Sequence, residues 1–192
     1  MKTKTIAYLD KPGIAECPKC LAAAAQRAAE LKLAHAVVAT GSGRTALELA
    51  RALRKAGSRA RVIGVGYSAE YAAKWGALLP RFTREAEKLG AVFITGGHAM
   101  GGLAGAVEKQ FGGATPSKTI ANTYYTLGQG FKVAVEAALM AADQGALPLK
   151  KEALALGGSA SGADTALILA PVCSSAFFDL RIREVVCMPR SG

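Results

Sequence analysis

One segment of the chain has the residue types and the order that are typical of a phosphate site. In AVVATGSGRTALELARAL, an apolar strand pattern passes directly into a helical pattern. Glycines let a backbone approach a ligand closely, and the free N–H groups of a first helical turn carry partial positive charge. Hydroxyls and an arginine can add hydrogen bonds and charge. The residues expected to hold a phosphate are Thr40, Gly41, Ser42, Gly43, Arg44 and Thr45.

Two other interpretations of this turn have to be weighed. Gly41, Gly43 and Ala46 satisfy the dinucleotide pattern G-x-G-x-x-G/A, which would indicate a nicotinamide site. Such a site needs Asp or Glu at the end of the next strand, and segment 62–68, VIGVGYS, contains neither. The Walker spacing G-x-x-x-x-G-K-[ST] is also absent. A strand-to-helix turn without any ligand stays open, because Ser and Gly cap helices on their own.

Further glycine-bearing loops follow predicted strands, in segments 64–68, 95–102 and 157–164. In an open parallel sheet, ligands bind outside the carboxyl ends of the strands, so these loops are expected to converge on one edge. Each loop taken alone is equally consistent with a tight turn. The ligand contacts expected from them are Gly66, Tyr67, Gly97, His98, Gly157, Gly158, Ser159, Ser161, Gly162 and Asp164.

A complete catalytic constellation is not recognisable in the sequence. His98 is placed where it could contact a ligand or transfer a proton, and a structural histidine is an equally good interpretation. No Ser-His-Asp, metal-ligand or paired-carboxylate spacing accompanies it. We therefore expect no metal site, and whether the protein catalyses a reaction stays open.

The segment Cys17-Pro18-Lys19-Cys20 has the C-x-x-C spacing of a thioredoxin-like redox site. The glycine-rich strand-turn-helix that follows and the chain length argue against that class. A solvent-facing helix start without redox function is the favoured interpretation. Cys173 and Cys187 are expected to be small buried hydrophobes.

The elements that must position these residues alternate between short β-branched runs and longer helical patterns. This alternation predicts one α/β domain over residues 1–192, a three-layer α/β/α sandwich with a mainly parallel sheet. Apolar runs follow one another closely after Leu154, which predicts a hairpin-like return at one sheet edge and an antiparallel strand near the C-terminus. A long helix over 119–144 is expected, with Ser117 as its N-cap and Gly145 as its stop. Strands are expected at 5–9, 35–40, 61–65, 91–95, 153–156, 165–170 and 182–187, and further helices at 18–33, 45–56, 81–89 and 103–111.

The composition excludes several function classes. Apolar residues make up 51% and charged residues 20%, which is typical of an ordered globular protein. The net charge of +10 favours anionic ligands, but aromatic residues are only 6%, so basic residues interleaved with stacking aromatics are not seen and nucleic-acid binding is not expected. The absence of a signal peptide and of a membrane-length apolar run predicts a cytoplasmic protein that does not bind membranes.

Taken together, the segments resemble stand-alone proteins similar to the C-terminal α/β domain of pyruvate kinase. The resemblance rests on YLDKPG, VVATGSGRTALELA, VIGVGYSAE, ITGGHAMGGLAGAV, TIANTYYTLGQGFKVAVEAALMAADQGAL, GGSASGADTALIL and SSAFFDLRIREVVCMPR. The related domain holds a sugar-phosphate effector, and the matching segments here are 40–45 and 157–165. The catalytic barrel is missing from this sequence, so no pyruvate kinase activity is expected.

The resemblance also implies a ligand and alternatives to it. The stand-alone relatives imply flavin mononucleotide (FMN) as the bound, phosphate-bearing ligand. The alternative functions are a flavin-dependent oxidoreductase and a sugar-phosphate-sensing regulatory module, and a homo-oligomer is compatible with either. The C-x-x-C segment departs from the family pattern, which leaves room for a separate redox role.

Overall fold

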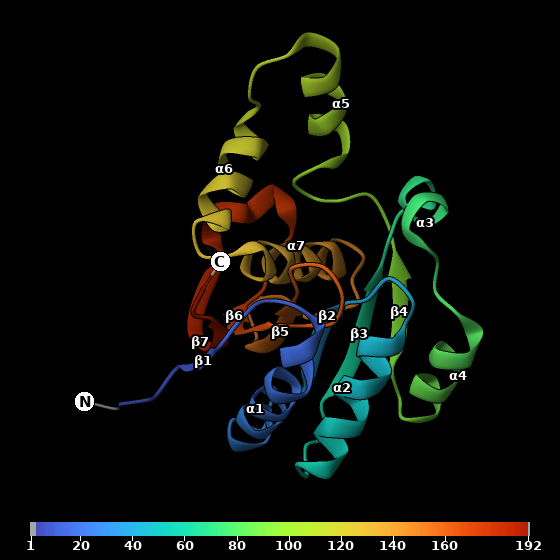
Figure 1. Cartoon of the computed structure of the whole chain (residues 1–192), viewed down its shortest axis with the longest axis vertical. Coiled ribbons are helices and arrows are strands. Elements are labelled where there is room, and N and C mark those ends of the chain that lie inside the picture. Colours follow the sequence, from blue (N-terminus) through green and yellow to red (C-terminus); the bar gives the residue numbers. More distant parts are fainter. Residues whose placement is uncertain (1–2, 192) are drawn as a thin grey trace.

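Seven strands form one sheet in the computed structural model of the chain, which describes residues 3–191 (Figure 1). The order across the sheet is β1-β7-β6-β5-β2-β3-β4. Only β6 runs against its neighbours among the strands described, so the predicted mainly parallel sheet with an antiparallel strand near the C-terminus is confirmed. The strands are β1 (Ala7–Leu9), β2 (His35–Ala39), β3 (Arg61–Gly66), β4 (Val92–Thr95), β5 (Ala153–Gly157), β6 (Thr165–Ala170) and β7 (Arg181–Pro189).

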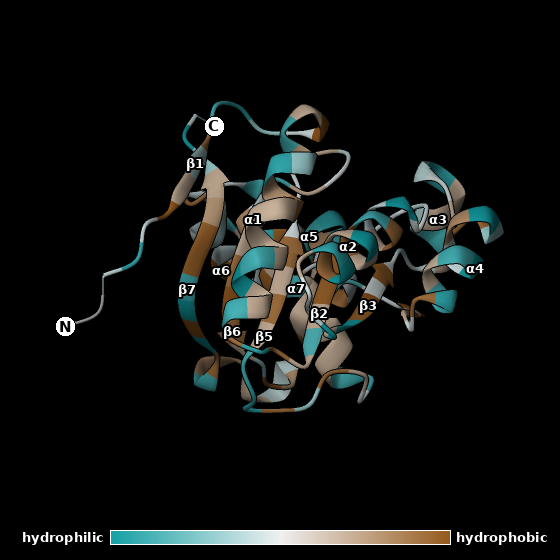
Figure 2. Ribbon diagram, turned by 90° about the horizontal axis from the view of Figure 1, so that it is seen from below, coloured by the Kyte–Doolittle hydropathy of each residue, from teal (hydrophilic) through white to brown (hydrophobic). Residues whose placement is uncertain are grey.

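Helices cover both faces of this sheet. The alternation of side chains along the strands separates two cores: Val38 and Ile168 pack under α1 and α2, whereas Val37 and Leu167 pack under α7. Figure 2 shows the apolar strands between helices whose outer faces are polar. The helices are α1 (Cys17–Glu30), α2 (Arg44–Lys55), α3 (Ala69–Trp75), α4 (Pro80–Lys88), α5 (Gly102–Phe111), α6 (Pro116–Tyr125) and α7 (Gln129–Asp143), with short 3₁₀ turns η1 (Ile14–Glu16) and η2 (Ser174–Asp179).

The prediction of one long helix over 119–144 is wrong, because two helices, α6 and α7, occupy this part of the chain. Gly128 has φ 108, a conformation outside the helical region that glycine adopts without strain, and the chain turns there. The N-cap of α6 is Thr115 and not Ser117, since the Thr115 hydroxyl accepts from the Lys118 N–H. The stop at Gly145 is confirmed by its left-handed φ of 69.

Two further differences concern the sheet edge and α3. The last strands were expected to form one edge of the sheet. Instead β1 is the edge strand, because it pairs in parallel with the outer side of β7. The sequence patterns also missed α3, a short helix that follows β3. As a result, α3 contributes side chains at the carboxyl ends of the strands that the sequence did not assign.

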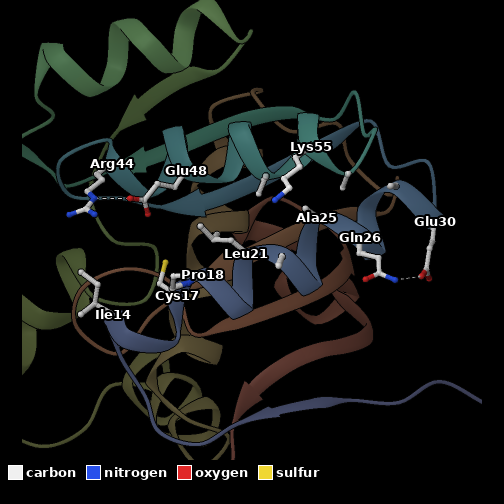
Figure 3. Close-up of a pocket in the computed structure, with 14 residues that line it drawn as sticks. Ile14, Cys17, Pro18, Leu21, Ala25, Gln26, Glu30, Arg44, Glu48 and Lys55 are labelled. Atoms are coloured by element: carbon white, nitrogen blue, oxygen red, sulfur yellow. Dashed lines mark hydrogen bonds and ion pairs between the residues drawn. The ribbon is translucent and has the colours of Figure 1, made fainter.

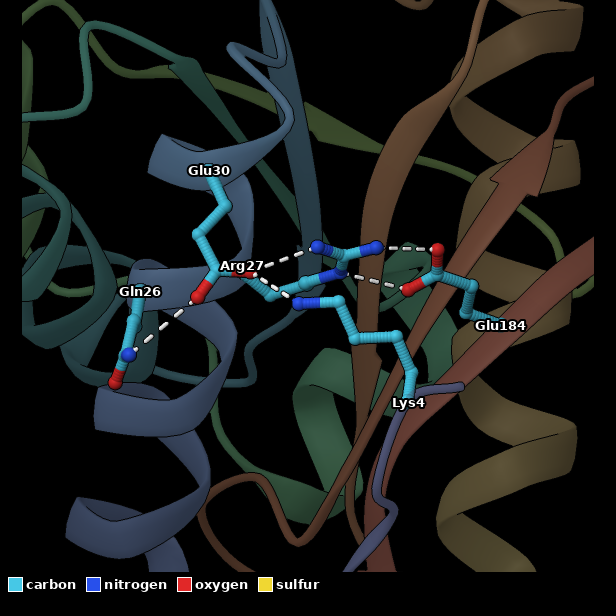
Figure 4. Close-up of polar contacts among 5 residues, drawn as sticks. All are labelled: Lys4, Gln26, Arg27, Glu30 and Glu184. Atoms are coloured by element: carbon cyan, nitrogen blue, oxygen red, sulfur yellow. Dashed lines mark hydrogen bonds and ion pairs between the residues drawn. The ribbon is translucent and has the colours of Figure 1, made fainter. Parts of the chain in front are cut away.

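A polar network ties the N-terminal segment and α1 to β7 (Figure 4). The Arg27 guanidinium donates to both carboxylate oxygens of Glu184, and Glu30 accepts from Arg27 and from Lys4. The two carboxylates raise the pKa of Arg27 further above its usual range. Because the Arg27 side chain is only 15% exposed, this bidentate pair fixes α1 on the β7 side of the sheet.

Gly157, at the end of β5, lies in close contact with α7. A Cβ on this residue would overlap the Gly130 carbonyl oxygen and come within 2.5 Å of the Ala134 nitrogen. Gly157→Ala is therefore expected to lower the free energy of unfolding by about 1–3 kcal/mol in urea denaturation. Gly105→Ala is the matched control, since a Cβ there meets open space inside α5 and alanine favours the helix. Equal stability of the two variants would contradict the close packing of β5 on α7.

Candidate functional site

The carboxyl ends of β2, β3, β4 and β5 lie at one edge of the sheet because these strands are parallel to one another. A cleft of about 720 Å³ lies at this edge. That volume falls within the range of small-molecule sites, about 300–1,000 Å³. The structure brings most of the predicted contact residues to it: Thr40, Gly41, Ser42, Arg44, Thr45, Gly66, Tyr67, His98, Gly158, Ser161 and Gly162 line the cleft.

The first turn of α2 faces this cleft with unpaired main-chain donors. The Thr40 hydroxyl accepts from the Gly43 N–H at 3.1 Å, and Gly43 takes the left-handed conformation with φ 91. The Ser42 hydroxyl receives a long contact of 3.4 Å from the Arg44 N–H. Within residues 3–191, the N–H groups of Thr45 and Ala46 have no protein acceptor. The turn therefore presents free donors and the positive end of the helix dipole to a ligand.

Arg44 contributes less free charge to this turn than the sequence suggested. Its side chain is exposed and its Nε donates to Glu48 at 2.7 Å. This carboxylate raises the pKa of Arg44 further and partly neutralises its field at the cleft. Exposed pairs of this kind are weak, so a ligand anion can compete with Glu48 for the guanidinium.

Aromatic side chains gather at another part of the cleft. His98 stacks on Tyr71 with ring centres 4.9 Å apart, and Tyr71 stacks on Trp75 at 4.7 Å. Tyr67 meets Trp75 edge-on at 5.4 Å and lies against Gly41, where a Cβ would stand 2.9 Å from its ring. Trp75 is the only tryptophan of the chain and is 61% exposed. Tyr67, Trp75 and His98 line the cleft and offer flat apolar surface for a planar ring, whereas Tyr71 stacks on Trp75 and His98 outside the lining.

The sequence patterns missed a buried ion pair that also lines the cleft. Lys132 and Glu136, one turn apart on α7, are 7% and 5% exposed. The Lys132 ammonium donates to one Glu136 oxygen, and the Met100 N–H donates to the other at 2.8 Å. Their spacing of four residues inside an otherwise apolar helix face was the available signal, since charges at such positions seldom remain buried without a role.

His98 is affected by this pair. Burial lowers the pKa of His98 below its ordinary value, and Lys132 lowers it further while Glu136 opposes the shift. The imidazole is consequently neutral at pH 7 and carries one donor and one acceptor nitrogen. It can therefore hydrogen-bond a ligand, but it adds no positive charge at that pH.

Several predicted contacts lie outside the cleft lining and shape the loops instead. The Asp164 carboxylate is fully buried and accepts from the Gly13 N–H, the Ser159 N–H and the Thr165 hydroxyl, at 2.9, 3.0 and 3.0 Å. It holds loop 157–164 to the segment before α1. The other predicted residues outside the lining are Gly43, Gly97, Gly157 and Ser159.

The helix start faces solvent at Pro18 and Lys19, as expected, but both cysteines of the C-x-x-C segment are buried. Cys17 Sγ accepts from the Ala163 N–H at 3.2 Å. Cys20 Sγ lies 3.4 Å from Cys187 Sγ. Burial raises the pKa of Cys17, and the contact with Cys187 together with burial raises that of Cys20. Neither thiol has the lowered pKa of a redox nucleophile.

Cys17 and Cys20 are therefore expected to react with iodoacetamide at least about tenfold more slowly than the half-buried Cys173 in the native protein. Peptide mass spectrometry after timed labelling measures this order directly, and labelling in urea supplies the rate for the accessible thiols. Preferential native labelling of Cys17 would restore a redox role for this segment.

A second cavity of about 730 Å³ lies between α1 and α2 (Figure 3). Its wall is mainly hydrocarbon, from residues such as Leu21 and Ala25. Ile14, Arg44 and Glu48 border both this groove and the cleft. The head of α2, where the N–H groups of Thr45 and Ala46 have no acceptor within residues 3–191, is the better site for an anion than this mainly hydrocarbon wall.

Comparison with known protein families gives no match: no family model fits this chain. None of the helices in residues 3–191 combines the length and apolar character that crossing a membrane requires. The same residues contain no cluster of three or more His, Cys, Asp or Glu side chains placed to hold a metal ion. The fold and the cleft together define an α/β protein with a candidate small-molecule site at the carboxyl ends of its strands.

Proposed function

We propose that this protein binds a phosphate-bearing small molecule in the cleft, with its phosphate at the head of α2. The observation that carries the proposal is the pair of N–H groups on Thr45 and Ala46, which have no acceptor within residues 3–191 and belong to a turn that lines a sizeable cleft. Donors of this kind at a helix N-terminus favour a doubly charged group. The net charge of +10 adds long-range attraction for an anion.

We propose FMN as this ligand. Its phosphate suits the α2 turn, and its planar ring suits the aromatic side chains that line the cleft, Tyr67, Trp75 and His98. The resemblance to the C-terminal domain of pyruvate kinase supports the same ligand. When bound, a flavin supplies electron-transfer chemistry, while the protein binds and orients it. The residues proposed to hold the phosphate are Thr40, Ser42, Arg44 and Thr45, and the loop residues Gly158, Ser161 and Gly162 border the same cleft.

A flavin-dependent oxidoreductase is the second candidate. It is favoured by the titratable group of Lys132, Glu136 and His98, because an enzyme needs side chains that hold or move protons beside the ring. Sugar-phosphate sensing, a homo-oligomeric state and a cytoplasmic location remain predictions from the sequence.

Thermal unfolding with matched ligands tests the proposal. A ligand that binds only the folded state raises the melting temperature. At 100 times its Kd it adds about 2.7 kcal/mol to the free energy of unfolding. FMN is expected to raise it by several degrees, and riboflavin, which lacks the phosphate, by clearly less. An absorption spectrum of the purified protein shows whether flavin co-purifies. Equal effects of FMN and riboflavin would contradict a phosphate site at α2.

A further inference from the structure

The ion pair of Lys132 and Glu136 requires an explanation beyond folding. Both side chains lie more than nine-tenths buried in the cleft wall, and the pair forms one hydrogen-bonded contact on a single helix face. Buried pairs are weak contributors to stability, because the cost of removing two charges from water offsets most of their attraction. A pair retained at the wall of a cleft is therefore a candidate for ligand contact.

The ammonium keeps capacity for a ligand. A lysine ammonium has three N–H donors, and Lys132 uses one of them in its hydrogen bond to Glu136. Its Nζ also lies 5.8 Å from the centre of the Tyr125 ring, another residue of the cleft wall. The Met100 N–H holds the second Glu136 oxygen, so the carboxylate that fixes Lys132 is itself fixed.

The pair belongs to the aromatic part of the cleft. Glu136 accepts from the Met100 N–H, Met100 lies two residues after His98 in the same loop, and His98, Lys132 and Glu136 all line the cleft. The phosphate turn at the head of α2 has its own donors and its own cation, Arg44. The cleft thus contains two positive features on different elements, α2 and α7.

We propose that Lys132 binds the electron-accepting ring of the ligand while the head of α2 binds its phosphate, and that Glu136, the counter-charge of Lys132, limits the positive charge that the ring experiences. This inference rests on the proposed function and adds the class of ligand: a molecule with a phosphate at one end and an aromatic ring that gains negative charge at the other. A flavin ring gains such charge on reduction at its N1 and C2 carbonyl region, where a neighbouring cation stabilises it.

Three ligands distinguish the proposed ring contact of Lys132 from the proposed phosphate contact of the α2 head. FMN has both phosphate and ring, riboflavin has only the ring, and ribose 5-phosphate has only the phosphate. Calorimetric titration of Lys132→Met is expected to show about tenfold weaker binding of FMN and riboflavin, with ribose 5-phosphate unaffected. Lys132→Arg, which keeps the charge, is expected to restore most of the affinity. Equal weakening of ribose 5-phosphate by Lys132→Met would overturn the assignment.

Sulfite titration of the FMN-loaded protein supplies a readout that a structural role would not move. The sulfite lone pair forms a bond to flavin N5, and the added negative charge is carried by the N1 and C2 carbonyl region. Lys132→Met removes the cation and is expected to weaken this adduct about tenfold. Glu136→Gln removes the counter-charge of Lys132 and is expected to strengthen the adduct about tenfold. Glu136→Gln retains an oxygen that can accept from the Met100 N–H, so the local fold is preserved.

The outcomes separate the inference from the function on which it rests. If the unaltered protein binds none of the three ligands, the proposed function is wrong and the inference with it. If FMN binds and both variants shift the sulfite affinity in the same direction, or neither shifts it, the proposed function stands and the role of Lys132 is refuted. Shifts of opposite sign support the electrostatic role.

Discussion

Ser42→Asp is expected to lower the affinity for FMN by at least about 100-fold without loss of stability. Ser42 lies half-buried in the turn immediately before α2, beside the proposed phosphate. A carboxylate there would repel the phosphate by several kcal/mol at short range. The same carboxylate would complement the positive end of the α2 dipole, so the helix itself should be as stable or more stable. Fluorescence titration of FMN and thermal unfolding without ligand measure the two effects.

Ser42→Asn is the matched control for this prediction. Asparagine has nearly the size of aspartate and keeps an oxygen that can accept from the Arg44 N–H, but it has no charge. FMN affinity within about fivefold of the unaltered protein is expected, because only one hydrogen-bond contact changes. If Ser42→Asp and Ser42→Asn bind FMN equally well, no phosphate lies at the head of α2.

Asp164→Ala is expected to lower the free energy of unfolding by about 3 kcal/mol or more. The carboxylate is fully buried and satisfies the Gly13 N–H, the Ser159 N–H and the Thr165 hydroxyl. Removing it leaves the part-buried Gly13 and Ser159 N–H groups and the buried Thr165 hydroxyl without this acceptor, and each lost partner of a buried donor costs about 1–3 kcal/mol. Urea denaturation followed by circular dichroism measures the loss.

Two comparisons sharpen the Asp164 prediction. Asp164→Asn keeps one oxygen, which can retain the two main-chain bonds, so its loss should be smaller than that of Asp164→Ala. Asp10→Ala is the surface control, because Asp10 is exposed and its only ion pair with a residue of segment 3–191, with Lys19, spans 3.7 Å. A cost for Asp164→Ala no larger than that for Asp10→Ala would contradict its role in holding the loop.

The sheet and the α2 turn could be predicted because local patterns determine them. The strand before Gly41 is uniformly apolar, as expected of a strand buried on both faces, and the helix after Arg44 has a clear apolar stripe. Parallel pairing then places the loops after β2, β3, β4 and β5 at one edge. The convergence of those loops follows from topology, so it required no knowledge of individual contacts.

The break between α6 and α7 could not be read from periodicity. The helical pattern continues across residues 126–128, and only the left-handed φ of Gly128 separates the two helices. A glycine inside a helical pattern is equally consistent with a continuous helix at a modest cost in stability. The tertiary position of α7 against Gly157, which decides the matter, is a contact between distant parts of the chain.

The chemistry of the cleft was only partly predictable for the same reason. In the sequence, Lys132 and Glu136 are two charges inside an apolar helical pattern, and only packing shows that they are buried together. Asp164 was expected to contact the ligand, yet one of its oxygens accepts from two main-chain N–H groups and the other from the Thr165 hydroxyl. Tyr71 and Trp75 belong to α3, a helix too short to give a clear pattern.

The main-chain amides of Thr45 and Ala46 offer the most direct test of the central claim. Nuclear magnetic resonance spectra of ¹⁵N-labelled protein, recorded as FMN or ribose 5-phosphate is added, follow each assigned amide separately. Saturable downfield shifts of the Thr45 and Ala46 protons are expected with both ligands, since a phosphate would accept the hydrogen bonds that these groups lack within residues 3–191. Unchanged Thr45 and Ala46 signals, with shifts confined to the groove between α1 and α2, would contradict a phosphate site at the head of α2.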